Sequence, residues 1–432
     1  MIKWNKYRLD EICHLVTDGT HDSPKNLVKG FPFIKGTQIK EGTINFSNCD
    51  YVSEEDHLKI IKRSKPEKGD ILFSNIGMNL GETAIIKVDF SFSIKNVALF
   101  KPNNTLVDNR FLYYLLTSPK EQLLLKNKRN GSAQPFLDLK TLRGHFLLIP
   151  NINTQIKIAA ILSKYDDLIE NNNQRIKLLD EMSEEIYKEW FVRLRFPGHE
   201  NLDSAKFKKI KLRECLFHYI GGGWGEEVPK GKHTEPAHVI RGTDFPGFNN
   251  GKLNFDVLRY HTASNLSSRI CEANDIIFEV SGGTESQSLG RTCFISEIAI
   301  NRFDAPVICA SFCKLLRINS KKVSPYYINE LLNRMHSTGE LKVYQVQSTG
   351  ISNYQFEDFI EATKVFIPPI EVQEKFDNII GPMYDEIQIL GAKNQVLQET
   401  RDLLLPRLIS GKLSVENLEI EELNMVAEST LT

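Results

Sequence analysis

The stretch that decides the fold runs from Thr154 to Phe191, TQIKIAAILSKYDDLIENNNQRIKLLDEMSEEIYKEWF. Apolar residues recur in it at multiples of seven, with further apolar residues three or four positions later, which is the pattern of one helical face. At 1.5 Å per residue, such a helix would be roughly 57 Å long, too long to be covered by one small domain. We therefore expect a second helix to cover its apolar stripe, whose seam residues are Ile158, Tyr165, Leu179 and Ile186.

A matching helix is predicted near the other end of the chain, from Val372 to Ile409. Its seam keeps the seven-residue spacing and consists of Phe376, Met383, Leu390, Leu397 and Leu404. An antiparallel, coiled-coil-like pair would bury both stripes. Asn172 lies on the first seam, where it either sets the register of the pair or marks a kink, and Gly391 raises the same alternative in the second helix.

The sequence that flanks these helices is duplicated as well. Ile34-Lys35-Gly36-Thr37 corresponds to Ile240-Arg241-Gly242-Thr243, and Leu80-Gly81-Glu82-Thr83 corresponds to Leu289-Gly290-Arg291-Thr292. Several such matches follow in the same order, which predicts a tandem pseudo-repeat of one unit, a mixed block followed by a long helix.

We therefore expect an α+β protein in which two mixed α/β blocks are separated by the helix pair. The predicted boundaries are 1–153 for the first block, 154–200 for the first helix and linker, 201–370 for the second block, 371–414 for the second helix and 415–432 for a frayed acidic end. Within the first block, short strands are expected near Phe33, Ile71, Ile85 and Leu99 and one helix from Asn109 to Leu125.

Charge is distributed unevenly along the chain although the net charge is only −1. Residues 1–150 hold 22 Lys and Arg against 16 Asp and Glu, whereas residues 371–432 hold 5 against 12. A surface that follows nucleic acid is expected to be basic. The blocks are thus compatible with DNA binding, and the acidic helices are better suited to spacing and protein docking.

Several protein classes are disfavoured by what the sequence lacks. It has no apolar run of membrane-spanning length and no signal-peptide core, so a cytoplasmic protein is expected. The seven cysteines are scattered without zinc-ligand spacing and are predicted to be reduced, mostly buried thiols. No phosphate-binding loop, HExxH or GxSxG motif occurs, and Gly221 to Gly225 is interpreted as a flexible loop. We predict no catalytic residue and no cofactor or metal site in this chain.

The features that favour binding lie on loops and helix ends of the blocks. Cations beside amides suit phosphate contacts combined with reading of base edges. The candidate DNA-binding residues are Lys126, Lys128, Arg129, Asn130, Gln134 and Asn79 in the first block, and Arg241, Ser286, Gln287, Arg291, Tyr344 and Gln347 in the second.

The motifs at the helix ends resemble those of a known family. They are Ile367-Pro368-Pro369-Ile370 with Gln373 before the second helix, Glu185 to Phe191 running into Arg195-Phe196-Pro197-Gly198, and Leu404 to Leu413 near the end. In these the chain resembles the specificity subunits of type I restriction-modification enzymes, often called HsdS, from about residue 5 to 415. The first junction, Asn151 to Thr154, departs from the family's usual P-P-x-x-E.

The resemblance implies that each block is a target recognition domain reading one half of a bipartite site in double-stranded DNA. The helices would fix the spacer and dock two modification (methyltransferase) subunits, which carry S-adenosylmethionine. Restriction and translocation subunits would supply ATP- and Mg-dependent steps. The alternatives are a protein-binding adaptor that never touches DNA, or the specificity part of a single-chain restriction-methylation enzyme.

Overall fold

The computed structural model describes residues 3–131, 134–201, 207–282, 288–348 and 351–419. The chain divides into two compact units. Unit 1 consists of the chain up to Asp167 together with the chain from Leu397 onward, and unit 2 is Leu168–Val396. Each unit therefore contains one block and a segment of both long helices.

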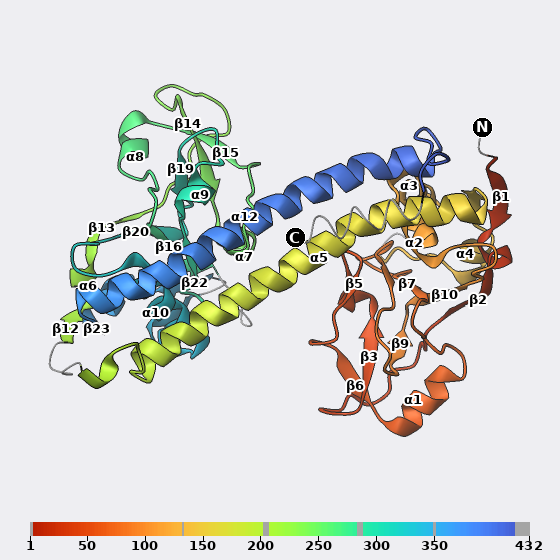
Figure 1. Cartoon of the computed structure of the whole chain (residues 1–432), viewed down its shortest axis with the longest axis horizontal. Helices are drawn as coiled ribbons and strands as arrows, with labels where there is room; N and C mark the ends of the chain where they lie inside the picture. Colours follow the sequence, from red (N-terminus) through yellow and green to blue (C-terminus); the bar gives the residue numbers. More distant parts are fainter. Residues whose placement is uncertain (1–2, 132–133, 202–206, 283–287, 349–350, 420–432) are drawn as a thin grey trace. The chain divides into compact units, whose positions relative to one another are not determined.

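Both predicted long helices are confirmed (Figure 1). Helix α5 extends over Ile152–Tyr187 and continues into a π-helical turn at Lys188–Val192. Helix α12 extends over Ile370–Ile409. Neither helix is interrupted, so a break at Asn172 or Gly391 is ruled out.

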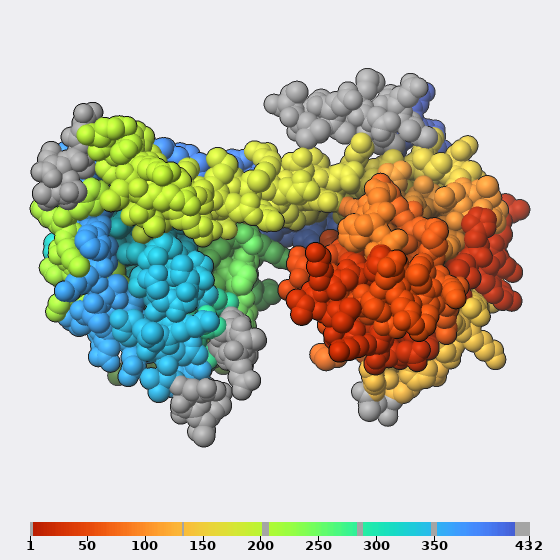
Figure 2. Space-filling model, turned by 90° about the horizontal axis from the view of Figure 1, so that it is seen from below, coloured from red at the N-terminus to blue at the C-terminus, as the bar shows by residue number. Residues whose placement is uncertain are grey.

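The block of unit 1 is built on two sheets. The strand order is β2-β10-β7-β8 in one and β6-β3-β9 in the other, where β3 and β9 are parallel. Two short antiparallel pairs, β1-β11 and β4-β5, complete it. In Figure 2, its red-to-orange atoms form one continuous body. The bounds are β1 Asn5–Arg8, β2 Cys13–Asp18, β3 Phe31–Lys35, β4 Ile39–Lys40, β5 Thr43–Ile44, β6 Asp50–Val52, α1 Glu54–Ile61, β7 Ile71–Phe73, β8 Thr83–Ile85, β9 Ser93–Lys95, β10 Ala98–Pro102, α2 Asn109–Thr117, α3 Pro119–Lys126, α4 Leu139–Arg143 and β11 Phe146–Ile149.

The block of unit 2 repeats this topology. Its sheets have the orders β13-β20-β16-β18 and β15-β14-β19, with β14 and β19 parallel, and β12 pairs with β23 as β1 pairs with β11. A further sheet, β17-β22-β21, occurs here. The bounds are β12 Lys208–Lys211, α6 Leu212–Cys215, β13 Leu216–Gly221, β14 Glu235–Ile240, α7 Phe245–Asn249, β15 Leu258–His261, α8 Ala263–Ser267, β16 Ile276–Glu279, β17 Ser281–Gly282, β18 Thr292–Phe294, α9 Glu297–Ile300, β19 Val307–Cys309, β20 Cys313–Ile318, α10 Pro325–Ser337, β21 Gln345–Ser348, β22 Ile351–Tyr354, α11 Phe356–Ala362 and β23 Lys364–Ile367. The matching strand orders confirm the predicted duplication.

One predicted element is divided in two. The expected helix from Asn109 to Leu125 is α2 followed by α3. Pro119 has no N–H to continue the first helix, and the Ser118 hydroxyl accepts the N–H of Glu121 as the cap of the second.

The apolar stripes of α5 and α12 contact the blocks as well as each other. In unit 1, Ile158 is buried in the core of the block, together with Leu405 and Leu408. In unit 2, Phe376 lies in the core of the other block. Leu390 contacts α5 directly, in a small cluster with Ile387 of its own helix and with Ile176 and Leu179. The remaining seam residues are half-buried, namely Tyr165, Leu179, Ile186, Met383, Leu397 and Leu404.

The stripes are thus divided between a partner helix and a block. The expectation that the helix pair alone buries them was too simple, because each block offers apolar surface of its own to the helix that leaves it.

All seven cysteines are free thiols, and six of them are buried. Burial raises the pKa of Cys13, Cys215 and Cys309 to about 12. These thiols therefore stay protonated and act as small apolar core residues.

Candidate nucleic-acid interface and spacer helices

A buried glutamine fastens each long helix to its block. Gln155 accepts the N–H of Asp108, at the start of α2, and donates to the carbonyls of Leu106 and Pro150 at 3.0 and 2.9 Å. Gln373 accepts the N–H of Ser324, at the start of α10, and donates to Pro368 O, both at 2.7 Å. The duplicated Ile-Pro and Gln motif thus has a physical role: it ties the first turn of the long helix to the helix of the block.

Polar contacts fix the register of the helix pair inside each unit. In unit 2, Asn172 Nδ2 donates to Asn394 Oδ1 at 2.8 Å, and Arg175 pairs with Glu386 at 2.9 Å. In unit 1, Asp166 pairs with Arg401 at 2.5 Å. The paired residue numbers run in opposite directions, as expected for antiparallel helices. Asn172 is buried, so its amide acts as the register-setting group that the sequence suggested.

The cations of the basic cluster of unit 1 are all exposed, and one of them is anchored by a side-chain contact. Lys128 Nζ lies 2.9 Å from Nδ1 of buried His145, whose Nε2 is 2.9 Å from Glu121. This chain of contacts holds Lys128 against the block. Lys126 and Arg129 are exposed, and neither forms an ion pair with a described residue. They remain the cations of the cluster that are available to phosphate.

Neutral candidates surround this cluster. Asn130 exchanges backbone hydrogen bonds with Phe136 and places its side-chain amide 3.3 Å from Asp138, while Gln134 is exposed. Asn79 donates to Gly36 O at 3.0 Å, which ties together two loops of the block.

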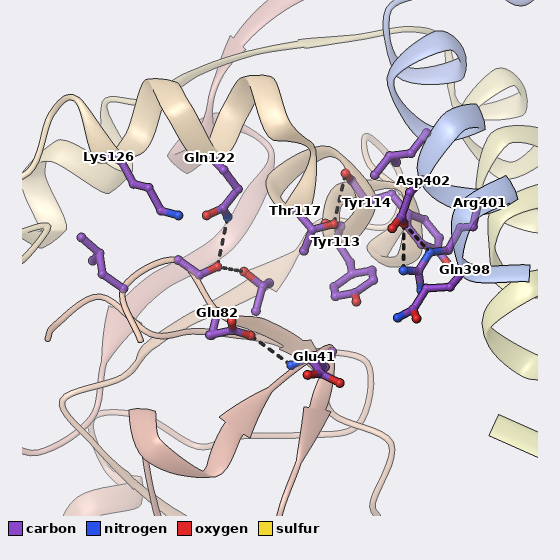
Figure 3. Close-up of a pocket in the computed structure, with 15 residues that line it drawn as sticks. Glu41, Glu82, Tyr113, Tyr114, Thr117, Gln122, Lys126, Gln398, Arg401 and Asp402 are labelled. Atoms are coloured by element: carbon purple, nitrogen blue, oxygen red, sulfur yellow. Dashed lines mark hydrogen bonds and ion pairs between the residues drawn. The ribbon is translucent and has the colours of Figure 1, made fainter. Parts of the chain in front are cut away.

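A polar cavity of about 330 Å³ lies beside Lys126 in unit 1 (Figure 3). The β4-β5 turn, α2, α3 and α12 line it, with charged groups of both signs. Burial raises the pKa of Tyr113, one of its wall residues, to about 12, so the phenol is neutral. On the α12 side Arg401 is held by Asp166 and Asp402. Arg401 is therefore neutralised and Lys126 is the other cation of the lining, so the cavity gives no specific sign of an anion site.

The two predicted arginines of unit 2 have carboxylate partners. Arg241 makes two side-chain hydrogen bonds to Asp244, each 2.9 Å, and Arg291 makes two to buried Glu279, at 2.8 and 2.6 Å. Both guanidinium groups thereby hold loops in place, which weakens the case for free phosphate contacts. Their role in DNA binding stays a prediction.

Two further candidates of unit 2, Tyr344 and Gln347, lie at the β17-β22-β21 sheet. Tyr344 packs on Phe359 with ring centroids 5.2 Å apart. Gln347 is in β21, and its backbone is paired with Ser352. Ser286 and Gln287 lie outside the described residues.

Sequence reasoning missed an exposed aromatic in the glycine-rich loop after β13. Trp224 is 42% exposed, and the guanidinium of Arg259 lies 4.9 Å from its ring centroid. Gly222 fits tightly against β19, because a Cβ there would lie 2.2 Å from the carbonyl oxygens of Cys309 and Ala310. The loop is therefore fixed at its base, and its single tryptophan among glycines was the available signal.

Metal clusters and membrane-spanning helices are both absent from the described ranges. No group of three or more His, Cys, Asp or Glu side chains there is arranged to hold a metal ion. Among the same residues, no helix combines the length and apolar character needed to cross a membrane.

The chain carries one block topology twice, each copy joined to a long helix, and comparisons with known proteins show which proteins it is similar to. Residues 1–181 match the family described as type I restriction modification DNA specificity domain. The chain is 27% identical to the type I restriction enzyme MjaIX specificity subunit of Methanocaldococcus jannaschii, over 72% of this chain and 71% of that protein. It is 26% identical to the HindI specificity subunit of Haemophilus influenzae, over 96% of this chain and all of that protein.

A solved structure has the same fold. The S subunit of a type I restriction-modification system from M. genitalium superposes with a TM-score of 0.58 at 16% identity, covering 94% of this chain and 96% of that one. Residues 1–181 thus match the type I restriction modification DNA specificity domain, and over most of its length the chain is similar to proteins named type I specificity subunits.

Proposed function

We propose that this chain is the DNA sequence-specificity subunit of a type I restriction-modification complex, in which each block reads one half of a bipartite site. The observation that carries the proposal is the duplication: one block topology occurs twice, and each copy leads into one of two antiparallel helices. Its relatives over the whole length are named specificity subunits. A repeated binding unit on stiff helices suits a two-part ligand.

In this function the chain itself is non-catalytic and cytoplasmic. Two methyltransferase subunits dock on the helices and bring S-adenosylmethionine, and motor subunits bring ATP and Mg. The role left to this chain is to position DNA: exposed cations such as Lys126 and Arg129 contact phosphates, while neighbouring amides read base edges.

Binding of duplex DNA at graded salt tests this proposal. The full chain, with its modification subunits, is titrated with a duplex that carries the site mapped from methylated adenines in the host genome. Replacing Lys126 and Arg129 by Ala should weaken binding and reduce the slope of log K against log salt by about 2, since each phosphate contact contributes about 0.9. Lys62→Ala, at an exposed lysine after α1, is the matched control. Binding that is absent or independent of salt for the wild-type complex would contradict the proposal and favour an adaptor.

The spacer role is tested by lengthening both helices. One heptad inserted after Asp167 and another after Val396 leaves the residues inside each unit unchanged, because the chain passes from one unit to the other at these positions. The added helix is about 10.5 Å long and nearly preserves the helical phase. We expect the preferred spacer to lengthen, by at most about three base pairs at 3.4 Å each. An unchanged spacer would show that the helices do not set it.

A further inference from the structure

A turn of the second block is seated directly on helix α12. The turn follows α7 and spans Phe248 to Leu253, with Gly251 at φ +71°. A Cβ on Gly251 would lie 2.8 Å from Ile387 O, and a Cβ on Gly391 would lie 2.2 Å from Asn250 O. The backbones of the two glycines are thus in direct contact. A Cβ atom on the turn or on α12 would not fit at this distance, so only glycine is permitted at both positions.

Side-chain hydrogen bonds fasten the turn on both sides of this contact. Gln388 Nε2 donates to Phe248 O and Gln395 Nε2 donates to Leu253 O, both at 2.9 Å. Arg302, from the end of α9, donates to Gly251 O at 2.8 Å and also to Gln395. Three side chains therefore donate to carbonyl groups of the turn, and two of these carbonyls, those of Gly251 and Leu253, accept from no other described group outside the regular elements.

This contact is a second attachment point between the block and α12, far along the helix from the first. The block is already tied to the start of α12 through Gln373. Gly391 lies eighteen residues further on, about 27 Å along the helix. A body held at two points this far apart on a rod cannot pivot about the first of them.

We propose that this seat, formed by Gly251, Gly391, Gln388, Gln395 and Arg302, fixes the orientation of the second recognition block on the spacer helix and thereby the tolerance for half-site spacing. Gly391, Gln395 and Arg302 are positioning residues. The inference rests on the proposed function, and it goes beyond it by assigning the strictness of spacing to named contacts.

The two glycines inside α12 provide a matched test. Gly391→Ala must push the turn away, whereas Gly381→Ala adds a methyl group whose nearest neighbour, Tyr326 Oη, is 3.5 Å away. Both changes raise helix propensity by about 1 kcal/mol, so a difference between them reports the seat.

In the experiment, each variant gene is introduced into a host from which the native gene has been deleted. Methylated adenines are then mapped at sites with the preferred spacer and at sites whose spacers are one base pair shorter or longer. We expect Gly391→Ala to lower discrimination between these spacers by about tenfold, with the half-site sequences unchanged, and Gly381→Ala to keep wild-type discrimination. A merely structural loss would reduce methylation at every spacer equally.

Gln395→Ala serves if Gly391→Ala fails to accumulate, because it removes two hydrogen bonds without a clash. Wild-type discrimination in the folded variants would overturn the inference. Absence of any bipartite methylation with the wild-type gene would instead reject the proposed function, so the two failures are distinguishable.

Discussion

Truncating Gln373 should release α12 from the second block. Gln373 is 2% exposed, and among the described residues it is the only hydrogen-bond partner of two buried backbone groups, the N–H of Ser324 and the carbonyl of Pro368. An unsatisfied buried donor or acceptor costs about 1–3 kcal/mol. Gln373→Ala leaves two such groups without a partner, and partial relaxation of the structure lowers the sum of the two costs. We therefore expect a loss of about 3 kcal/mol in the free energy of unfolding of unit 2.

The assay is urea unfolding followed by the fluorescence of Trp190. This residue is buried in the core of unit 2, with its ring centroid 5.9 Å from that of Phe376, one turn after Gln373. Replacing Trp4 and Trp224 by Phe leaves Trp190 as the only tryptophan. The midpoint should fall, while the slope with urea stays constant if the unfolded surface is unchanged.

Gln174→Ala is the control. Gln174 is exposed on α5 and its side chain makes no hydrogen bond to a described residue, so the substitution has the same chemistry and a similar helix-propensity effect. If Gln373→Ala destabilises unit 2 no more than Gln174→Ala does, the glutamine does not fasten the helix and the interpretation of the duplicated motif is wrong.

Two further predictions concern buried polar groups of unit 2. Asn172→Ala should cost about 1–3 kcal/mol in urea unfolding because Asn394 Oδ1 loses its donor, although Asn394 Nδ2 still donates to Asn173. Leucine at positions 172 and 394 together should be close to neutral, and an equal loss in the single and double variants would contradict the pairing. Burial raises the pKa of Glu330, which accepts a hydrogen bond from Tyr384, to about 7. Since this pKa is raised in the folded state, its stabilising contribution is complete below the unfolded value near 4.5 and is lost as pH rises through 7. Glu330→Gln should therefore unfold like wild type at pH 4, below the unfolded pKa, and be more stable than wild type at pH 8, by up to about 3 kcal/mol; a difference that does not change with pH would refute this.

The helices and the duplication were predictable because they depend on periodicity and order, which sequence displays directly. For most residues proposed for DNA binding, the sequence could not show whether the side chain is free or already paired with another side chain. The partner of Arg241, Asp244, is three residues away and could have been noticed. The partner of Arg291, Glu279, is twelve residues away, and the pairing depends on how β16 and β18 meet.

Gly391 illustrates the same limit. In isolation, a glycine inside a predicted helix suggests a break, and the sequence offered no reason to prefer another explanation. The cause is a tertiary contact with residues about 140 positions earlier, Asn250 and Gly251. No local pattern contains that information.

The two units keep the same helix attachment but seat the corresponding turn differently. The sequence pairs Glu41-Gly42 with Asn250-Gly251. In unit 1 the Cβ position of Gly42 lies 2.4 Å from the Tyr113 hydroxyl, on α2, and the cavity of Figure 3 separates this turn from Gln398 and Asp402 of α12. In unit 2 the turn meets the backbone of α12 itself. The glutamine attachment therefore defines where a block joins its helix, and the seat of the turn defines how the block is oriented on that helix. The seat differs between the two units, whereas the glutamine attachment is the same in both. The orientation of each block on its helix can therefore change while the fold stays the same. Such independence is required if the two half-sites of the DNA are to diverge.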